Sequence, residues 1–197
     1  MSIKLLLAGY LGCGNFGDDA IMASLYQAVD GNEFDVKALS GNPDETYRQY
    51  KIISYPRRDS KAIAGAIAEC DVLVFPGGSV FQDATSVGSV YYYHGLIRQA
   101  KSKGKKVVML SQGVGPLTTF LGKRWARAAF SMVDVVAVRD SGSAQAIRDL
   151  GARTNIKMAA DLSFLLPHTP AGVESDSFNV GGMKTIGIAP RPLGKAF

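Results

Sequence analysis

Polar residues able to bind a small charged molecule accompany glycine-rich or turn-forming stretches at several points of the sequence. Asp18, Asp83 and Asp161 offer carboxylates, which accept hydrogen bonds from sugar hydroxyls or serve as general bases. Arg139 offers a guanidinium, whose planar fork of donors suits a carboxylate or a phosphate, and Gln112 adds an amide. Neighbouring glycines let backbone amides approach a ligand at the start of a helix. These residue types indicate a site for an anionic or hydroxylated small molecule.

The first glycine-rich stretch, residues 9–19, contains the spacing G-x-G-x-x-G at Gly12, Gly14 and Gly17. That spacing suggests a dinucleotide fold, but two features oppose it. Asp18 and Asp19 would repel a pyrophosphate at the helix start, and the second predicted strand ends in Leu-Ser-Gly instead of a ribose-binding acidic residue. NAD binding is therefore disfavoured. The two aspartates either begin the helix or bind hydroxyls of a sugar-like substrate or position a reacting group.

The other polar residues each have a structural alternative. Arg139 either holds an anionic ligand or forms an ion pair with Asp140 or Asp161. Gln112 either bonds a ligand or ties loops together. The same two roles are open to Asp161, which follows a further expected strand end at Ala159-Ala160. Asp83 either contacts the ligand or caps a helix together with the glutamine before it. No spacing of His, Cys, Asp or Glu resembles a zinc or iron site, so we expect no metal and no cofactor.

Short apolar runs alternate with helical stretches as far as residue 150. The predicted strands are residues 4–8, 35–39, 51–54, 71–75, 107–110 and 135–138, and the predicted helices are 18–29, 60–70, 86–102, 118–132 and 141–150. This alternation predicts right-handed βαβ units and an α/β fold with a doubly wound, mostly parallel, Rossmann-like sheet. The loops at 9–19, 76–83, 112–116 and 139–141 follow predicted strands, so we expect them at the carboxyl edge, where such sheets bind ligands.

The composition is that of an ordinary globular protein, with 47% hydrophobic and 20% charged residues among 197. The net charge is +5, and the basic residues form no stripe interleaved with aromatics, which argues against a nucleic-acid partner. Two cysteines form no disulfide framework and indicate a reducing compartment. The first apolar run is too short for a signal peptide or a membrane span, so we expect a cytoplasmic protein, with peripheral membrane contact left open.

Residues 1–169 are predicted to form a Rossmann-like N-terminal domain. The pattern changes after Pro167, because residues 170–184 are polar and glycine-rich and resemble a linker. Residues 185–189 again resemble a strand, and we expect residues 185–197 to begin a second domain that the sequence does not complete. The oligomeric state is not predicted.

Six segments in this order resemble the polysaccharide pyruvyl transferase family, and they extend over nearly the whole chain. The segments are residues 9–18, 76–83, 112–117, 138–141 with the Leu-Gly pair at 150–151, 160–167 and 186–192. One departs mildly from the family pattern, since a Gly-Gly-Gly-Ser string is replaced by Pro76-Gly77-Gly78-Ser79. The resemblance rests on all six segments occurring in this order.

The resemblance implies transfer of pyruvate from phosphoenolpyruvate to a sugar, or a lipid-linked sugar, of a cell-wall or exported polysaccharide precursor, with formation of a ketal. It also implies a fold similar to the N-terminal domain of GT-B glycosyltransferases. Asp18 and Arg139 would be catalytic, Arg139 by holding phosphoenolpyruvate. The residues expected to bind substrates are Gly14, Asn15, Gly17, Gly77, Gly78, Ser79, Gln82, Asp83, Gln112, Gly113, Gly115, Asp161 and Arg191.

The family's catalytic histidine and a further lysine lie in a second half that has no counterpart in these residues, so we expect this chain alone to be inactive. Two alternatives remain open. One is a GT-B glycosyltransferase that uses a sugar nucleotide. The other is a truncated, non-catalytic module that binds a glycan.

Overall fold

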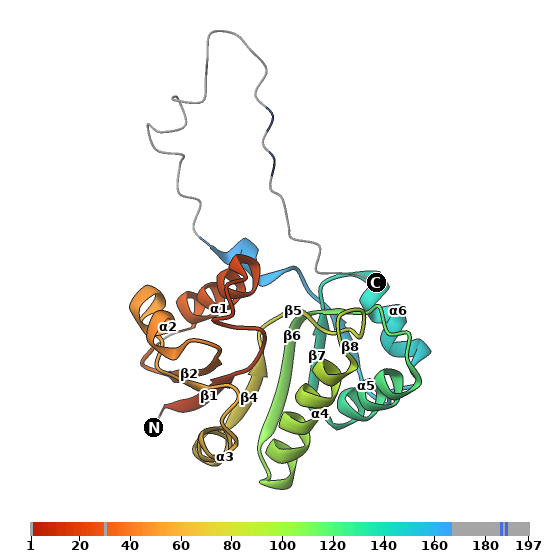
Figure 1. Cartoon of the computed structure of the whole chain (residues 1–197), viewed down its shortest axis with the longest axis horizontal. Helices are drawn as coiled ribbons and strands as arrows, with labels where there is room; N and C mark the ends of the chain where they lie inside the picture. Colours follow the sequence, from red (N-terminus) through yellow and green to blue (C-terminus); the bar gives the residue numbers. More distant parts are fainter. Residues whose placement is uncertain (1, 30, 167–185, 187, 189–197) are drawn as a thin grey trace. The chain divides into compact units, whose positions relative to one another are not determined.

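Short apolar runs form the strands of one parallel sheet, as the alternating pattern predicts. The computed structural model describes residues 2–29, 31–166, 186 and 188. Its strands run in the order β3-β2-β1-β4-β6-β7-β8, and β5 pairs with the end of β6 (Figure 1). All pairs are parallel. The strands are β1 (Ile3–Leu7), β2 (Phe34–Ser40), β3 (Ser54–Pro56), β4 (Val72–Phe75), β5 (Gly78–Phe81), β6 (Lys106–Val114), β7 (Val135–Val138) and β8 (Ile156–Met158).

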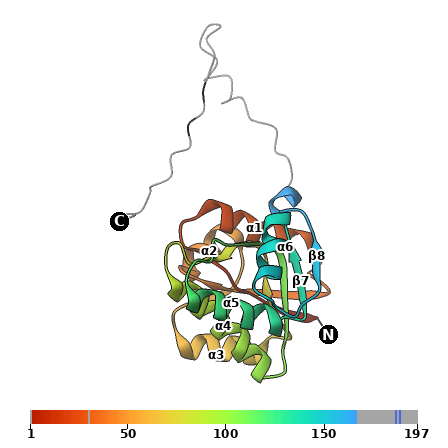
Figure 2. The same ribbon diagram turned by 90° about the vertical axis from the view of Figure 1, so that its right-hand side faces the viewer.

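Helices cover both faces of this sheet, because the chain winds outward from β1 in two directions (Figure 2). One buried cluster lies between the sheet and α3 to α6, and a second lies between the sheet and α1. The helices are α1 (Phe16–Ala28), α2 (Pro43–Tyr50), α3 (Ser60–Glu69), α4 (Val87–Ser102), α5 (Phe120–Met132) and α6 (Ser141–Asp149), followed by a 3₁₀ turn, η1 (Leu162–Leu165). The doubly wound, Rossmann-like fold predicted from the sequence is confirmed.

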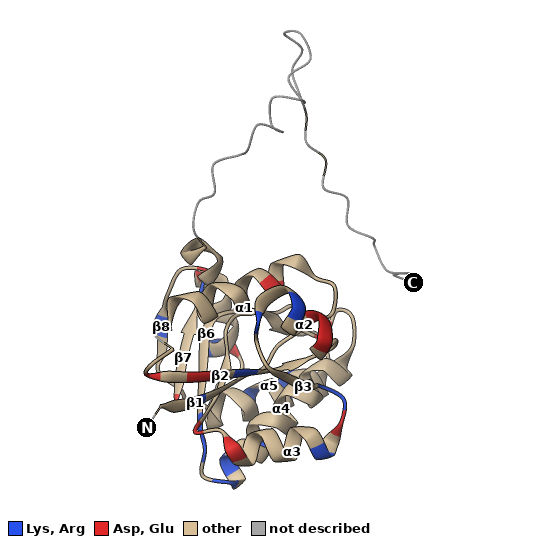
Figure 3. Cartoon of the chain, turned by 90° about the vertical axis from the view of Figure 1, so that its left-hand side faces the viewer, with Lys and Arg blue, Asp and Glu red and all other residues tan. Residues whose placement is uncertain are grey.

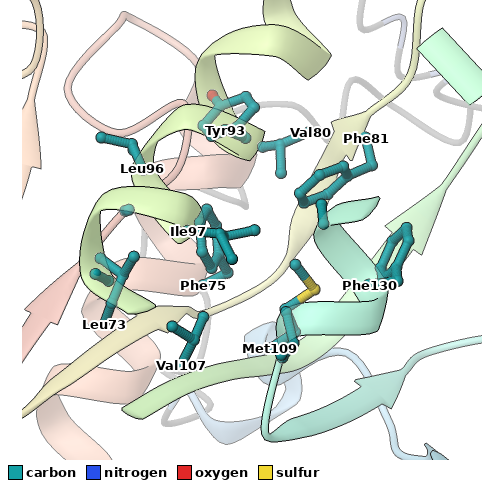
Figure 4. Close-up of a cluster of buried hydrophobic side chains, with 14 of the residues drawn as sticks. Leu73, Phe75, Val80, Phe81, Tyr93, Leu96, Ile97, Val107, Met109 and Phe130 are labelled. Carbon is teal, nitrogen blue, oxygen red and sulfur yellow. The ribbon is translucent and has the colours of Figure 1, made fainter. Parts of the chain in front are cut away.

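The larger cluster is built from apolar side chains that alternate along the strands. Phe75, Phe81, Tyr93 and Phe130 pack ring against ring inside it, with the Phe81 and Phe130 centroids 4.9 Å apart (Figure 4). Each of these four residues is at most 1% exposed. Burial of side chains this large stabilises the fold by about 1.5–3 kcal/mol apiece. The cluster therefore fixes β4, β5 and β6, whose ends carry the candidate site.

Four elements differ from the sequence-based expectation. Helix α2 and strand β5 were not predicted, β3 begins three residues later than expected, and β8 ends at Met158, two residues before the strand end expected ahead of Asp161. α2 has a single buried residue, Thr46, so it lacks the apolar periodicity that reveals a helix. β5 begins with Gly-Ser and has only two apolar residues, whereas β4 and β7, which also have four residues, are apolar throughout and were predicted. The predicted loop at residues 112–116 is in part the end of β6, which extends to Val114.

The described residues 2–166 belong to one compact unit, and a second unit comprises residues 167–197. The expected linker at 170–184 and Arg191 lie outside the described residues, as does the expected strand at 185–189 apart from residues 186 and 188. The domain boundaries inferred from the sequence stay predictions.

Candidate functional site

The carboxyl ends of β1, β4, β6 and β7 meet at one edge of the sheet, on both sides of the point where the strand order reverses. Asp18, in the first turn of the helix that follows β1, lies against Gly78, the first residue of β5. The Gln112 amide at the end of β6 donates to the Gly78 carbonyl oxygen. Arg139 Nη2, after β7, donates to Ser79 Oγ at 2.9 Å. Asp18 and Arg139 are 121 positions apart in the sequence. The fold brings both of them next to the dipeptide Gly78-Ser79.

Asp18 is positioned by the start of α1. Asn15 caps this helix, with its Oδ1 accepting from the Gly17 amide at 3.1 Å and its Nδ2 donating to Asp18 Oδ2 at 2.5 Å. A carboxylate in the first turn is stabilised by the partial positive charge of the helix N-terminus. A Cβ at Gly78, where φ is +79°, would lie 2.5 Å from Asp18 Oδ1. Only glycine therefore lets the chain turn here with Asp18 in this place.

Asp19 has a different role from Asp18. It is 8% exposed, and its Oδ1 accepts from the Gly12 amide at 2.7 Å. Burial raises the pKa of the Asp19 carboxyl, and the Gly12 hydrogen bond opposes part of that rise. Of the two aspartates, Asp19 closes the glycine-rich loop, and Asp18 lies at the edge of the sheet.

Arg139 is held in a fixed orientation by an ion pair and a hydroxyl group. Its Nη1 lies 2.7 Å from Asp161 Oδ2, and its Nε lies 3.8 Å from Asp140 Oδ2. The structural pairing that the sequence left open is therefore present. A guanidinium has five N–H donors, and the bonds to Asp161 and Ser79 use two of them. Arg139 can thus be anchored and still present donors to a ligand.

The two carboxylates beside Arg139 are both kept ionised. Burial alone would raise the pKa of Asp161, but hydrogen bonds from the Ser163 amide and from Arg139 bring it below its usual value. The amide of Ser143 lowers the pKa of Asp140, which caps α6. A Cβ at Gly113 would lie 2.6 Å from Ser79 Oγ and 2.9 Å from Arg139 Nη2. The absence of a side chain at Gly113 therefore makes room for the guanidinium.

A cavity of about 650 Å³ opens beside Arg139. A cavity of this size accommodates a small organic ligand. Its walls include two cationic side chains, Arg139 and Lys123, and the first turn of α6 at Gly142 and Ser143. Because helix N-termini and cationic side chains both attract negative charge, this part of the cavity favours an anion. The remaining lining residues are Ser79, Gly113, Val114, Gly115, Pro116, Leu117, Asp140, Ala146, Asp149 and Leu150.

Two of the residues expected to bind substrate are engaged elsewhere. Asp83 is 8% exposed, and its two carboxylate oxygens accept four hydrogen bonds from the amides and hydroxyls of Thr118 and Thr119. Burial opposes ionisation, but these bonds lower the pKa of Asp83 to about 2. The Gln82 side chain both donates to and accepts from Thr85. The geometry supports structural roles for both, because Asp83 fastens the start of α5 and Gln82 closes a turn.

The other residues that the sequence predicted to bind substrate lie in different places around the candidate site. Gln112 is fully buried, and its Nε2 donates to two carbonyl oxygens, those of Gly78 and Gly113. It therefore ties β5 to β6 beneath the site. Gly14 is exposed, with open space where a Cβ would lie. Gly77 lies against Ile21 and Ser111 at the end of β4, and Gly115 lines the cavity.

Two cationic residues at this edge escaped sequence analysis. Lys123 lines the cavity from the first turns of α5. Its position shortly after the Thr118-Thr119 pair, at the start of a predicted helix, could have indicated that it lies at this edge. Arg57 follows β3 as Arg139 follows β7, and it was missed because β3 had been placed three residues too early. Its guanidinium lies over the rings of Tyr10 and Tyr92, at 5.3 and 5.1 Å from their centroids.

Among the described residues, no cluster of three or more His, Cys, Asp or Glu side chains could hold a metal ion. In the same part of the chain, no helix is long and apolar enough to cross a membrane.

The structure is a Rossmann-like α/β domain with a cavity at its carboxyl edge as the candidate site, a class of fold found in glycosyltransferases. Solved structures that match include an alpha-glucosyltransferase in complex with UDP and a 13-mer DNA containing an HMU base. The TM-score is 0.55 at 13% identity, over 82% of this chain and 43% of that one. The chain thus spans less than half the length of that enzyme, and the likeness concerns the fold alone.

Sequence comparison identifies the family directly. The model of the polysaccharide pyruvyl transferase family matches residues 15–195. The chain therefore belongs to the polysaccharide pyruvyl transferase family, as the six ordered segments predicted. No curated protein sequence matches it significantly. The structure of an AraC family transcriptional regulator from Pseudomonas putida matches at 15% identity over 80% of this chain and 75% of that one, but its TM-score of 0.36 supports no conclusion.

Proposed function

We propose that this protein takes part in the transfer of a pyruvyl group from phosphoenolpyruvate to two hydroxyls of a sugar, forming a ketal. The observation that carries the proposal is the Arg139 guanidinium, anchored by Asp161 and Ser79 at the wall of a cavity of about 650 Å³. Membership of the polysaccharide pyruvyl transferase family supports a sugar of a polysaccharide precursor as the acceptor.

Phosphoenolpyruvate can use the cationic groups of the cavity wall, which also carries the carboxylates of Asp140 and Asp149. It carries a carboxylate and a phosphate, and the wall offers a guanidinium, an ammonium and the first turn of α6. A carboxylate can take two parallel N–H bonds from Arg139, and a phosphate is suited to Lys123 and to helix amides. We therefore assign the donor to the cavity between β7, α5 and α6.

The acceptor hydroxyls are assigned to the neighbourhood of Asp18. Asp18 lies against Gly78, and the next residue, Ser79, bonds Arg139, so the carboxylate and the guanidinium flank one dipeptide. A carboxylate accepts the hydrogen bond of a sugar hydroxyl and orients its oxygen for attack. This arrangement brings an anion-binding group and a hydroxyl-binding group to the same edge of the sheet.

The reaction balances as follows. The terminal carbon of phosphoenolpyruvate gains a proton and becomes a methyl group, and the neighbouring carbon becomes electrophilic. Two sugar hydroxyl oxygens bond to that carbon in turn, and its bond to the phosphate oxygen breaks. Of the two hydroxyl protons, one balances the proton gained by carbon, and the other leaves with phosphate. Asp18 is the proposed acceptor of a hydroxyl proton, and Arg139 holds the donor in place.

The experiment measures binding, because no acid able to protonate the carbon has been identified among the described residues. Phosphoenolpyruvate and UDP-glucose are titrated separately into the 197-residue chain by calorimetry. We expect phosphoenolpyruvate to bind and UDP-glucose to bind far more weakly. Preference for UDP-glucose would favour the glycosyltransferase alternative, and failure of both to bind would contradict a donor site in these residues.

A further inference from the structure

The outer surfaces of α4 and α5 form an exposed aromatic and basic face, which we call the α4–α5 face. The two helices lie side by side against the sheet (Figure 2). Phe120, Leu121 and Tyr91 are 77%, 47% and 58% exposed. Trp125 is half-buried, with its ring centroid 4.8 Å from that of Tyr91. Large apolar side chains grouped on a surface are unusual unless something covers them.

Three basic residues of this face lie on the same side of α5 as Phe120. On α5, Phe120, Lys123, Arg124 and Arg127 follow the spacing i, i+3, i+4, i+7, which places them on one side of a helix, and all four are exposed. Arg98 on α4 is exposed as well. Neither helix contains an aspartate or a glutamate. Within residues 2–29 and 31–166, no ion pair joins Arg98, Lys123, Arg124 or Arg127 to an acidic side chain.

Other surface helices of the protein do not share this charge pattern. α2 on the far side of the sheet mixes charges, with Asp44 and Glu45 in its first turn and Arg48 in its last (Figure 3). The sequence had suggested that the basic surplus is not gathered in one stripe, and the structure corrects this for α5. The apolar and the cationic residues therefore coincide on one side of the molecule.

From this coincidence we propose that the α4–α5 face docks on the surface of an anionic phospholipid membrane. Aromatic and leucine side chains beside lysine and arginine are the combination that enters the boundary between headgroups and acyl chains. Each basic residue near an anionic leaflet strengthens binding about fivefold. The docking is peripheral, since Phe120 and Leu121 at the start of α5 are the residues that insert.

A lipid surface fits this face better than a nucleic acid does. Leu121 offers no ring on which a base can stack, and Trp125 turns its ring toward Tyr91 in place of standing open as a stacking platform. Phe120 and Leu121 are consecutive at a helix end, which suits insertion into a layer.

The docking face and the cavity beside Arg139 share Lys123, which lines the cavity from α5. A protein held by this face would therefore keep its cavity close to the lipid surface. If the proposed function holds, this placement suits a sugar acceptor carried on a lipid. The docking inference itself rests on the surface alone and not on the reaction.

The test uses the 197-residue chain with vesicles of phosphatidylcholine, with or without phosphatidylglycerol. Trp125 is the sole tryptophan of the sequence, so its fluorescence reports directly on this face. We expect a blue shift and co-sedimentation with the phosphatidylglycerol vesicles, and little of either with phosphatidylcholine alone. Binding should weaken steeply in about 1 M salt, where charges are screened within about 3 Å.

Two variants and one matched control locate the binding. Arg124→Gln with Arg127→Gln should weaken binding about 25-fold, and Phe120→Ser with Leu121→Ser at least about tenfold. Phe16→Ser is the control, because Phe16 is also the first residue of a helix and is 81% exposed, but it lies on α1 at the other face of the sheet. We expect it to bind like the unaltered chain.

Several results would overturn the proposal. These are failure to bind the anionic vesicles, equal binding to both vesicle types, equal loss with Phe16→Ser, and no loss with the two α5 variants. Tighter binding to a single-stranded oligonucleotide than to vesicles would point to nucleic acid instead. A dimer in solution that is abolished by Phe120→Ser would show that a second copy of the chain covers the face. Titration of phosphoenolpyruvate into the same variants shows whether donor binding is kept when vesicle binding is lost. Failure of the docking proposal is thereby distinguished from failure of the proposed function.

Discussion

Two arginines at the carboxyl edge of the sheet occupy equivalent places and have opposite surroundings. Arg57 follows β3 and Arg139 follows β7, at the two sides of the sheet. Arg57 lies over two tyrosine rings and bonds the Tyr93 hydroxyl at 3.0 Å, and among the described residues no carboxylate forms an ion pair with it. Arg139 is paired with Asp161, bonds Ser79 and lines the large cavity.

The difference shows that position at a strand end does not by itself make a binding residue. The rings of Tyr10 and Tyr92 and the Cys13 sulfur occupy the surroundings of the Arg57 guanidinium, so this cation packs the edge of the fold. Arg139 is anchored through two of its donors, and the cavity lies beside it. We therefore assign anion binding to the β7 side and a structural role to the β3 side.

The largest effect is expected for Arg139→Lys. Lysine replaces a planar fork by a point charge and loses the bidentate contact with a carboxylate. Affinity for phosphoenolpyruvate should fall by about 1.5–3 kcal/mol, which is about 10- to 150-fold. Calorimetry measures the affinity, and circular dichroism checks that the fold is intact. Unchanged affinity in a folded variant would remove Arg139 from the donor site.

Asp83→Asn should lower the free energy of unfolding by about 2 kcal/mol, because the Asp83 carboxylate fastens the start of α5. The pKa of Asp83 is about 2 in the folded protein, against 3.8 for the free side chain. Its ionised form therefore stabilises the fold above about pH 4, and this contribution is lost as the pH falls from about 4 to about 2. Urea unfolding measures the difference between the two proteins, which should shrink over that pH range. A difference independent of pH would contradict this account.

Arg57→Lys should affect stability and leave binding alone. An ammonium cannot lie over both rings and bond Tyr93 as the guanidinium does, so the free energy of unfolding should fall by about 1–2 kcal/mol. Affinity for phosphoenolpyruvate should be unchanged. A loss of affinity as large as that of Arg139→Lys would break the distinction between the two sides of the sheet.

Asp18→Asn is expected to have the smallest effect on stability, less than about 1 kcal/mol, because it removes one carboxylate from a helix start that Asn15 already caps. Phosphoenolpyruvate should bind equally well or slightly more tightly, since a negative charge leaves the same edge of the sheet. Thermal unfolding and calorimetry give the two values. Weaker binding of phosphoenolpyruvate would show that Asp18 contacts the donor, which the account assigns to Arg139.

The sequence allowed the sheet to be predicted where the pattern was long. The parallel α/β topology followed from apolar strands alternating with helices, and the glycine-rich loops correctly indicated the edge where Asp18, Ser79 and Arg139 meet. Elements without a continuous apolar pattern could not be predicted, because β5 has only two apolar residues and α2 buries a single residue. The misplaced β3 also concealed Arg57.

The side-chain partners at the site were beyond sequence analysis. Arg139 and Asp161 are 22 residues apart in the chain. They pair only because the end of β7 lies beside the segment that follows β8. The engagement of Asp83 by Thr118 and Thr119 depends likewise on a contact across 35 or 36 positions. Such long-range contacts leave no periodic signal, so the sequence left both the binding and the structural alternatives open.

The central claim is that the anionic donor binds on the β7 side, at Arg139. The most direct measurement is an NMR titration of the 197-residue chain, carrying isotope-labelled arginine, with phosphoenolpyruvate. The account predicts that the Arg139 side-chain signals and the amides of Gly113 and Ser143 shift together, while those of Arg57 stay in place. Shifts centred on Arg57, or no saturable shift at Arg139, would contradict it.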